Sequence, residues 1–327
     1  MNGLVAQGIT LGFMSELLAL PTQQQLGAAL ASLTPAGESA SHSSAMTTGA
    51  TFAGHLQSCR VAGEGDEHAV IREGQCIWAR TTARRLGLDA GQDGQAMQER
   101  SLLYTGGVQF DLGGPWRLGT GLGYETSNSR IASGARTDTE RIHAGVIIKY
   151  NPGPLFLSGG ITGGYGWSDN RRPVLFGAFS ATATSESQSA FAAARLTAAY
   201  QFNFGSWYAK PQVDFALTGL HRDAFVETGS GGIALAVRQS NDKVFTASPL
   251  LELGTQFGIS DFGVARPFVR AGFTWRDKDT FATTASFAEA SSELSRFTIQ
   301  TKVDKVVGDV GAGIDVVGRG DTALRIL

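Results

Sequence analysis

The chain has 327 residues, of which 17% are charged, and its formal net charge is −2. Soluble domains carry roughly a quarter charged residues, so this chain is poor in charge, and the small net charge gives no argument for a nucleic-acid partner. Glycine is frequent, with 43 residues, and no stretch approaches the ~18 consecutive apolar residues of a membrane helix. This composition fits a membrane β-barrel, whose apolar residues alternate with lumen residues, or a glycine-rich secreted β protein.

The start of the chain, MNGLVAQGITLGFM, lacks the basic region and the long apolar core of a signal peptide. An exported protein needs such a peptide, so we expect the natural protein to begin upstream. Residues 1–20 are then the remnant of a preceding exported domain or of a linker.

Residues 21–58 have a different composition from the rest of the chain. Three leucines at helical spacing follow Pro21, a residue that favours the first turn of a helix, and Ala, Ser, Thr and Gly dominate 38–56. A helix of small residues fits inside a narrow tube, and twenty helical residues span about 30 Å, the thickness of a bilayer core. The segment is predicted to be a helix that threads a pore, with a flexible linker as the alternative.

The chain has two cysteines, Cys59 and Cys76. Two cysteines this close in a chain of exported type indicate one disulfide that closes a small loop. A pair of reduced thiols is the alternative.

From Gln75 onwards the sequence alternates apolar and polar residues with a period of two, which is typical of strands with one face in each of two environments. In 101–112, for example, Leu102, Tyr104, Val108 and Phe110 share one face. The predicted strands cover 76–84, 101–112, 116–126, 141–150, 155–167, 188–202, 207–219, 245–257, 265–275 and 306–317, and 322–327 begins an eleventh.

The connections between these strands alternate strictly between short and long. The short ones are rich in Gly, Pro and Asp, as tight turns require, and the long ones are polar. This alternation is typical of outer-membrane barrels, which have short periplasmic turns and longer extracellular loops. The short connections are 113–115, 151–154, 204–206, 260–263 and 318–321, and the long ones are 86–100, 128–139, 168–186, 221–242 and 277–295.

The charged residues of the strands lie opposite the aliphatic ones, and several apolar faces end in Trp or Tyr, as in the aromatic girdles of membrane barrels. We therefore expect Leu122 and Val213 to face lipid, and Gly121 to face a polar lumen. The residues predicted to face the lumen are Arg117, Glu125, Arg141, His143, Lys149, Arg195, Lys210, Asp214, Glu252, Arg270, Asp309 and Asp315.

Several short motifs, in their order along the chain, resemble the translocator (β) domain of classical autotransporters, the type V secretion family. The similarity covers roughly 20–327. The motifs include ALPTQQQLGAALASL at 19–33, SCR…CIWAR at 58–80, YAKPQVDF at 208–215, RPFVRAGF at 266–273 and GAGIDV at 311–316.

The resemblance implies an all-β, antiparallel outer-membrane barrel of twelve strands with an N-terminal helix through its lumen. About ten and a half strands are present, so 59–327 is expected to be a barrel domain that is incomplete at its C-terminus. The implied function is to anchor a passenger domain and export it to the cell surface. The implied partners are outer-membrane lipid, the barrel-assembly machinery, periplasmic chaperones and the protein's own passenger.

No enzymatic activity, metal or cofactor is predicted. His143 has no recognisable triad partners, the chain has no GxSxG motif, and it has no Cys/His cluster of the metal-binding kind. Some autotransporters cleave themselves at an Asn of the pore helix, and 22–56 contains no Asn. The alternatives left open are a porin or other channel-type barrel without a passenger, an outer-membrane barrel enzyme, and an adhesin.

Overall fold

The computed structural model describes residues 13–57, 59–61, 72–88, 96–229, 232–259, 263–318 and 323–326. Predictions for residues 1–12, for the loop at 89–95 and for the turns at 260–262 and 319–322 lie outside the described residues.

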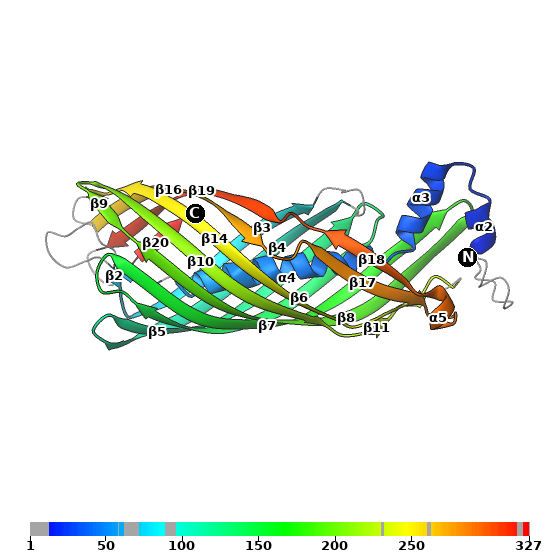
Figure 1. The fold of residues 1–327 in the computed structure, drawn as a ribbon, viewed down its shortest axis with the longest axis horizontal. Helices are drawn as coiled ribbons and strands as arrows, with labels where there is room; N and C mark the ends of the chain where they lie inside the picture. The colour runs from blue at the N-terminus through cyan, green and yellow to red at the C-terminus, as the bar shows by residue number, and fades with distance from the viewer. Residues whose placement is uncertain are drawn as a thin grey trace.

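One antiparallel sheet curls around a central helix and makes up most of the molecule (Figure 1). Along its main path each strand pairs with the strands before and after it in the chain, so the sheet is a meander. The path consists of β3 (Cys76–Leu88), β4 (Met97–Gly113), β5 (Trp116–Ile131), β6 (Arg136–Tyr150), β7 (Leu155–Phe176), β8 (Phe179–Tyr200), β10 (Trp207–Arg222), β14 (Ser240–Thr255), β16 (Gly263–Arg276), β19 (Val306–Gly318) and β20 (Ala323–Ile326).

These strands correspond one to one to the eleven predicted from the period-two pattern, and the predicted fold class is confirmed. Among the described residues, β3 pairs only with β4 and β20 pairs only with β19, so the path is an open, curled barrel wall.

Tight turns join the strands at one end of the wall, which we call the turn end. Gly113, Gly114, Gly153 and Gly205 all have positive φ there, between 58° and 107°. Other residues adopt this backbone conformation only with strain, which explains why glycine marks these connections in the sequence.

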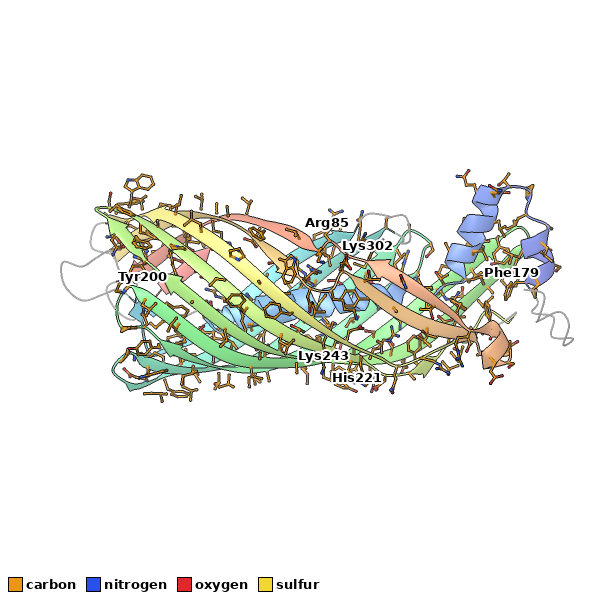
Figure 2. The ribbon with its side chains drawn as sticks, viewed as in Figure 1. Arg85, Phe179, Tyr200, His221, Lys243 and Lys302 are labelled. Carbon is orange, nitrogen blue, oxygen red and sulfur yellow. A yellow bond between two sulfur atoms is a disulfide. The ribbon has the colours of Figure 1, made fainter. Side chains whose placement is uncertain are left out.

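At the opposite end, the loop end, the strands run further than predicted. The segment 168–186 was expected to be a loop, and this expectation is wrong, because β7 and β8 continue through it and pair up to Phe176 and Phe179. Its alternation places Asp169 and Arg171 on one face and Asn170 and Arg172 on the other, and two polar faces carry no hydrophobic signal of a strand. Phe179 and Tyr200 mark the two ends of β8 in Figure 2.

Two other predicted loops contribute a second sheet at the loop end. Its four strands lie in the order β11, β13, β17, β18, and the short helix α5 (Ser292–Ser295) follows β17. The remaining short strands are β1 and β2, which pair with each other, β9, which pairs with β10, β15, which pairs with β16, and β12, which pairs with β8. The bounds are β1 (Arg60–Val61), β2 (Arg72–Glu73), β9 (Phe202–Phe204), β11 (Phe225–Val226), β12 (Thr228–Gly229), β13 (Leu235–Val237), β15 (Phe257–Ile259), β17 (Thr280–Phe287) and β18 (Phe297–Lys302).

From residue 13 onwards, the described N-terminal part contains the helices α2 (Met14–Leu18), α3 (Gln23–Ser32) and α4 (Ala36–His55). The side chain of Thr22 caps α3 by accepting a hydrogen bond from the backbone N–H of Gln25, at 3.2 Å. Figure 1 shows α2 and α3 outside the wall at the loop end and α4 inside it. The segment predicted as a pore helix is therefore divided between these two places.

The outward face of the wall is apolar, as the alternation predicts. Leu122 is 69% exposed, whereas Glu125, three residues further along β5, is fully buried. Trp116 and Trp207 lie at the turn end of this outer face and are both exposed. Large exposed side chains continue around the sheet, including Ile142, Val146, Ile161, Leu196, Phe215, Leu217, Leu253 and Val269.

Candidate functional site in the lumen

The helix α4 occupies the space inside the curled sheet. It contacts β4, β5, β6, β7, β8 and β10 of the main wall and β17 of the second sheet. Along its second half, Ser44, Ala45, Thr48, Phe52 and Ala53 are all buried. A helix with buried residues on several sides is enclosed rather than resting on a surface.

The end of α4 fits against glycines of the wall. A Cβ atom added at Gly145 would lie 2.8 Å from Leu56 Cδ1 and 3.1 Å from Phe52 Cε1, and one added at Gly121 would lie 2.8 Å from Leu56 Cδ2. These separations are too short for non-bonded carbon atoms, whose optimum is about 3.5–4.0 Å. Glycine at these positions leaves the volume that Phe52 and Leu56 fill.

A second close contact lies nearer the N-terminus of α4, where the Phe191 ring lies against one glycine of the helix and one of the wall. A Cβ at Gly49 of α4 would lie 2.7 Å from the ring of Phe191, and one at Gly164 of β7 would lie 2.4 Å from the same ring. His143 lies between two aromatic rings, 5.4 Å from Phe52 and 5.6 Å from Phe191 by ring centroids. The aromatic rings of this layer therefore depend on glycines in both the helix and the wall.

Polar contacts join the helix to the wall at three levels. Thr48 donates to Glu125 at 2.7 Å, and Arg195 donates to the backbone carbonyl of Ala50 at 3.2 Å. Near the C-terminal end of the helix, hydrogen bonds join His55 to Thr105 at 2.9 Å and to Thr82 at 3.1 Å. Just beyond it, Gln57 donates to Thr197 at 2.8 Å. These bonds give the helix a defined depth and rotation.

The buried carboxylate of Glu125 is surrounded by two guanidinium groups and an imidazole. Arg141 donates to it at 2.6 Å, Arg84 lies 3.6 Å away, and His143 Nε2 also lies at 3.6 Å. A buried charge is costly unless it is paired and hydrogen-bonded, and here β3, β6 and α4 supply the partners. The helix contributes one of these partners, because the Thr48 hydroxyl donates to Glu125 when α4 lies in the lumen.

A second buried acid, Asp214 of β10, has three partners on the wall. Arg195 donates to it at 3.0 Å, Thr197 at 2.5 Å and Gln212 at 2.8 Å. Arg195 and Thr197 are also contacts of the helix and of Gln57, so this cluster supports the same seat from the other side.

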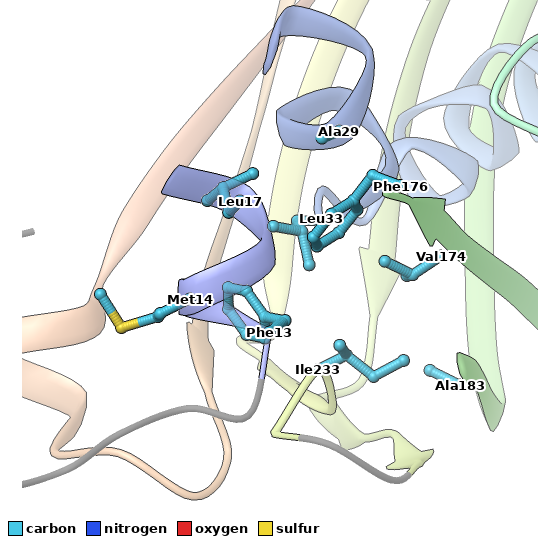
Figure 3. Close-up of a cluster of buried hydrophobic side chains, with 9 residues drawn as sticks. All are labelled: Phe13, Met14, Leu17, Ala29, Leu33, Val174, Phe176, Ala183 and Ile233. Carbon is cyan, nitrogen blue, oxygen red and sulfur yellow. The ribbon is translucent and has the colours of Figure 1, made fainter. Parts of the chain in front are cut away.

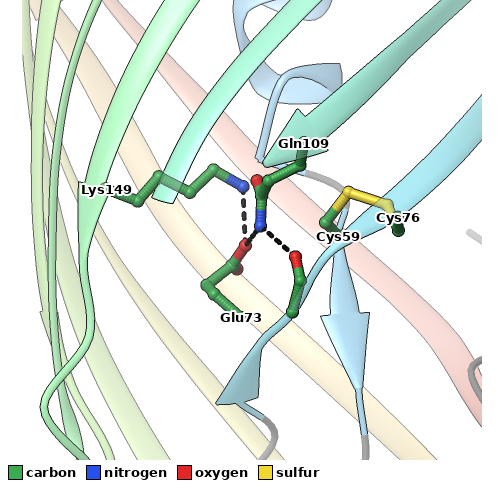
Figure 4. The surroundings of a disulfide bond; sticks show 6 residues. Cys59, Glu73, Cys76, Gln109 and Lys149 are labelled. Carbon is green, nitrogen blue, oxygen red and sulfur yellow. Dashed lines mark hydrogen bonds and ion pairs between the residues drawn. A yellow bond between two sulfur atoms is a disulfide. The ribbon is translucent and has the colours of Figure 1, made fainter. Parts of the chain in front are cut away.

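The turn end of the lumen carries the disulfide and a third ion pair (Figure 4). Cys59, just after α4, is bonded to Cys76 at the start of β3. Beside it, Glu73 accepts hydrogen bonds from Lys149 at 2.7 Å and from Gln109 at 3.1 Å, and Gln109 also donates to the carbonyl of Gly74 at 2.7 Å. The covalent bond and the ion pair thus hold the chain where it passes from the helix into the first long strand.

The side of the lumen formed by β10, β14, β16, β19 and β20 is filled by its own side chains. Tyr208 donates to Glu252 at 2.9 Å, and the guanidinium of Arg266 stacks over the Tyr208 ring at 4.3 Å. Arg325 lies 3.2 Å from both Glu252 and Asp315. This network is mostly buried and pairs charges of opposite sign across four strands.

The twelve residues predicted to face the lumen fall into separate groups. Glu125, Arg141 and His143 share one cluster; Arg195 and Asp214 share a second; Glu252 and Asp315 share a third through Arg325. Two more of the twelve form ion pairs with other residues: Lys149 pairs with Glu73, and Arg117 donates a hydrogen bond to Asp111 beside the first tight turn. Arg270 and Asp309 lie 3.3 Å apart. Lys210 lies over the Phe156 ring.

Sequence reasoning missed the residues of α4 that make the closest contacts. Phe52 and Leu56 stand in a segment whose small residues dominate its composition, and Thr48 has no local signal that marks it as a partner of Glu125. Phe52 and Leu56 are one helical turn apart, and this i, i+4 pair is the one signal that indicates a packed face.

Among the helices of the described residues, none has the length and apolar character needed to cross a membrane. Within the same described residues, no group of three or more His, Cys, Asp or Glu side chains is arranged to hold a metal ion.

The sequence profile of the autotransporter beta-domain matches residues 77–326. The chain belongs to the autotransporter beta-domain family. It is therefore a translocator of the bacterial outer membrane, attached to a passenger on the cell surface. Outer-membrane barrels have short turns on the periplasmic side and longer loops outside the cell, which assigns the turn end to the periplasm and the loop end to the extracellular side.

Solved structures support this fold. The chain is similar to the translocator domain of the autotransporter NalP from Neisseria meningitidis, with a TM-score of 0.60 and 15% identity, over 85% of this chain and 97% of that one. It is also similar to the transport unit of AIDA-I from Escherichia coli, with a TM-score of 0.50 and 12% identity, over 82% and 87% of the two chains. No curated protein matches the sequence.

Proposed function

We propose that α4 is the linker to the passenger and that it closes the lumen once export is complete. The observation that supports this most strongly is the seat of Phe52 and Leu56 over Gly121 and Gly145. In an open channel no helix would fill the volume that these glycines leave, so glycine would not be required at these positions. The fit therefore favours a plugged translocator over a porin-type barrel or an adhesin.

We further propose that the charged residues of the strands line the lumen and fix the helix in it. This set is the twelve residues named from the alternation, and the buried Glu125 and Asp214 clusters support the assignment. Paired charges neutralise each other and still leave the lumen polar. A polar lumen offers no apolar surface to which a passing chain would stick.

The proposed division of the chain follows from this role. Residues 1–20 belong to the end of the passenger or its linker, 21–58 to the linker that enters the pore, and 59–327 to the barrel domain. The proposed partners beyond lipid and passenger are the barrel-assembly machinery and periplasmic chaperones. We propose no catalytic role for the lumen residues, since each buried acid is already held by cations and hydroxyls.

The Cys59–Cys76 disulfide is proposed to form in the periplasm and to fix where the linker leaves the wall. The bond closes a loop with a sequence separation of 17 residues, so its contribution to stability is about 3 kcal/mol at most. Mass spectrometry of unreduced peptides from the envelope is expected to show the linked pair. Two free thiols that react with an alkylating reagent would contradict this proposal.

Planar-bilayer conductance tests the plug. The natural protein is expected to be almost closed, and deletion of 38–56 is expected to open a large, steady channel. Heat-modifiable migration on gels serves as the control that the deletion variant has formed a barrel. Equal conductance with and without the segment would show that α4 does not close the lumen, as a porin-type reading requires.

A further inference from the structure

The hairpin of β7 and β8 projects beyond the rest of the wall on the extracellular side. The last pair between β6 and β7 is Arg136 with Arg171, so 172–176 of β7 have no partner in β6. Five residues of strand reach roughly 16 Å. The projecting tip is thus a platform above the mouth of the pore.

The segment that precedes the pore helix covers this platform. Phe13 and Leu17 of the α2 region and Leu33 after α3 pack with Val174 and Phe176 of the hairpin in one buried cluster (Figure 3). The cluster also contains Met14, Ala29, Ala183 and Ile233. Burial of this many apolar side chains outside the membrane is the mark of a folded contact rather than of a trailing linker.

At the centre of this contact lies a buried arginine, Arg172, that joins three separate parts of the chain. It forms a two-pronged ion pair with Glu227 and donates to the carbonyl of Ser32 at 2.7 Å and to that of Ile233 at 2.8 Å. Ser32 is the last residue of α3, so the guanidinium sits at a helix C-terminus, where positive charge is favourable. Glu227 also accepts the backbone N–H of Leu235 at 3.0 Å, which leaves both carboxylate oxygens satisfied.

A further contact holds the very tip of the hairpin. The carboxylate of Glu16 in α2 accepts the backbone N–H of Ala178 at 3.3 Å. The two helices therefore contact the hairpin at its tip, through Glu16, and along its side, through Ser32.

We propose that Phe13–Leu33 docked on the tip of β7 and β8 is an extracellular latch, with Arg172 as its central contact. This inference rests on the translocator function and adds a part to it. Only residues 34 and 35 separate the latch from α4, so any movement of α4 toward the periplasm requires that the latch undock. The latch sets how far the linker enters the lumen and keeps the exported chain outside.

Arg172→Gln tests the latch, and Arg171→Gln is its matched control. Arg171 is the neighbouring residue on the same strand, but it is exposed on the opposite face. In the full protein, hydrogen exchange of the α2 and α3 amides is expected to rise by about 100-fold or more in Arg172→Gln, because Glu227 is left buried without its charge partner. Exchange in α4 is expected to change much less, which separates failure of the latch from failure of the plug.

Pulse-chase measurement of passenger exposure on intact cells tests the consequence. Arg172→Gln is expected to lengthen the half-time of export at least threefold, and Arg171→Gln is expected to leave it unchanged. If Arg172→Gln lowers barrel assembly, Phe176→Ala against the exposed Leu175→Ala gives the same comparison. Unchanged exchange in α2 and α3 would overturn the docking, and faster exchange with a normal half-time would overturn the holding role.

Discussion

The two sides of the lumen differ in which side chains fill the space in front of them. One side, the glycine wall, consists of Gly121 and Gly123 of β5, Gly145 of β6 and Gly164 of β7. The side chains of Phe52, Leu56 and Phe191 lie in front of it.

The other side, the side-chain wall, consists of Tyr208 of β10, Glu252 of β14, Arg266 and Phe268 of β16 and Asp315 of β19. It has a close glycine as well, but a Cβ at Gly254 would lie 2.4 Å from the ring of Tyr208, a residue of the wall itself.

The difference teaches which part of the wall is shaped for the helix. Where glycines face the lumen, their missing side chains are replaced by Phe52 and Leu56, so that wall is complete only when α4 is present. The side-chain wall is complete without the helix. Changes in the glycine wall are therefore expected to affect closure of the pore, and changes in the side-chain wall are expected to affect stability alone.

The largest expected effect comes from removing an aromatic ring from each side. Phe52→Ala and Phe268→Ala both remove a buried ring, and each is expected to lower the free energy of unfolding by about 3–5 kcal/mol in urea titrations followed by heat-modifiable migration. Only Phe52→Ala is expected to raise the conductance in planar bilayers. A comparable rise for Phe268→Ala would remove the distinction between the two walls.

The next effect tests whether the difference between the walls is confined to the lumen face. Leu122 of β5 and Val269 of β16 are exposed on the lipid face of opposite sides, and Arg at either position is expected to cost about 2–4 kcal/mol. The measurement is the yield of folded barrel in outer-membrane fractions. Asp309→Asn, which changes a half-exposed residue of the predicted lumen face, is the control and is expected to lower the yield much less, because its ion pair with Arg270 is exposed to water. Equal losses in all three variants would contradict the assignment of the faces.

A smaller effect compares two glycines in equivalent lumen positions. A Cβ at Gly145 meets Leu56, Thr162 and Phe52, whereas one at Gly311 of β19 meets only the flexible side chain of Arg270, at 3.0 Å. Gly145→Val is expected to destabilise by about 1–3 kcal/mol through overpacking, and Gly311→Val by less, because Arg270 can move aside. Equal shifts of the urea midpoint would show that the glycine wall is not specially crowded.

Sequence alone predicted the wall well because its signals are local. The alternation in 116–126 identifies the two faces of β5, and the tight turns at 113–115 and 204–206 fix where strands end at the periplasmic side. The structure of the loop end was harder to predict. The strand β7 has polar residues on both faces up to Arg172, and the apolar residues beyond it pack against α2 and α3. No pattern within the hairpin shows that a segment 140 residues earlier covers it.

The lumen was only partly predictable for a similar reason. Alternation identified Glu125 and Arg141 as residues of one face, and they lie in one cluster, but their partner Thr48 comes from the helix. The number of glycines indicated room for a helix, yet which glycines meet which side chains depends on the depth of α4. That depth is set by contacts between parts of the chain that are far apart in sequence.

A double-mutant cycle between Gly145 and Leu56 tests most directly whether the glycine wall is shaped for the helix. Gly145→Ala adds the methyl group that Leu56 excludes, and Leu56→Ala removes the side chain that excludes it. Each single change is expected to lower the free energy of unfolding in lipid vesicles. The double variant is expected to lose less than the sum of the two, by about 1 kcal/mol or more, because the new methyl group occupies part of the vacated space. Losses that add to within about 0.5 kcal/mol would show that the two residues do not fit against each other and would contradict the account.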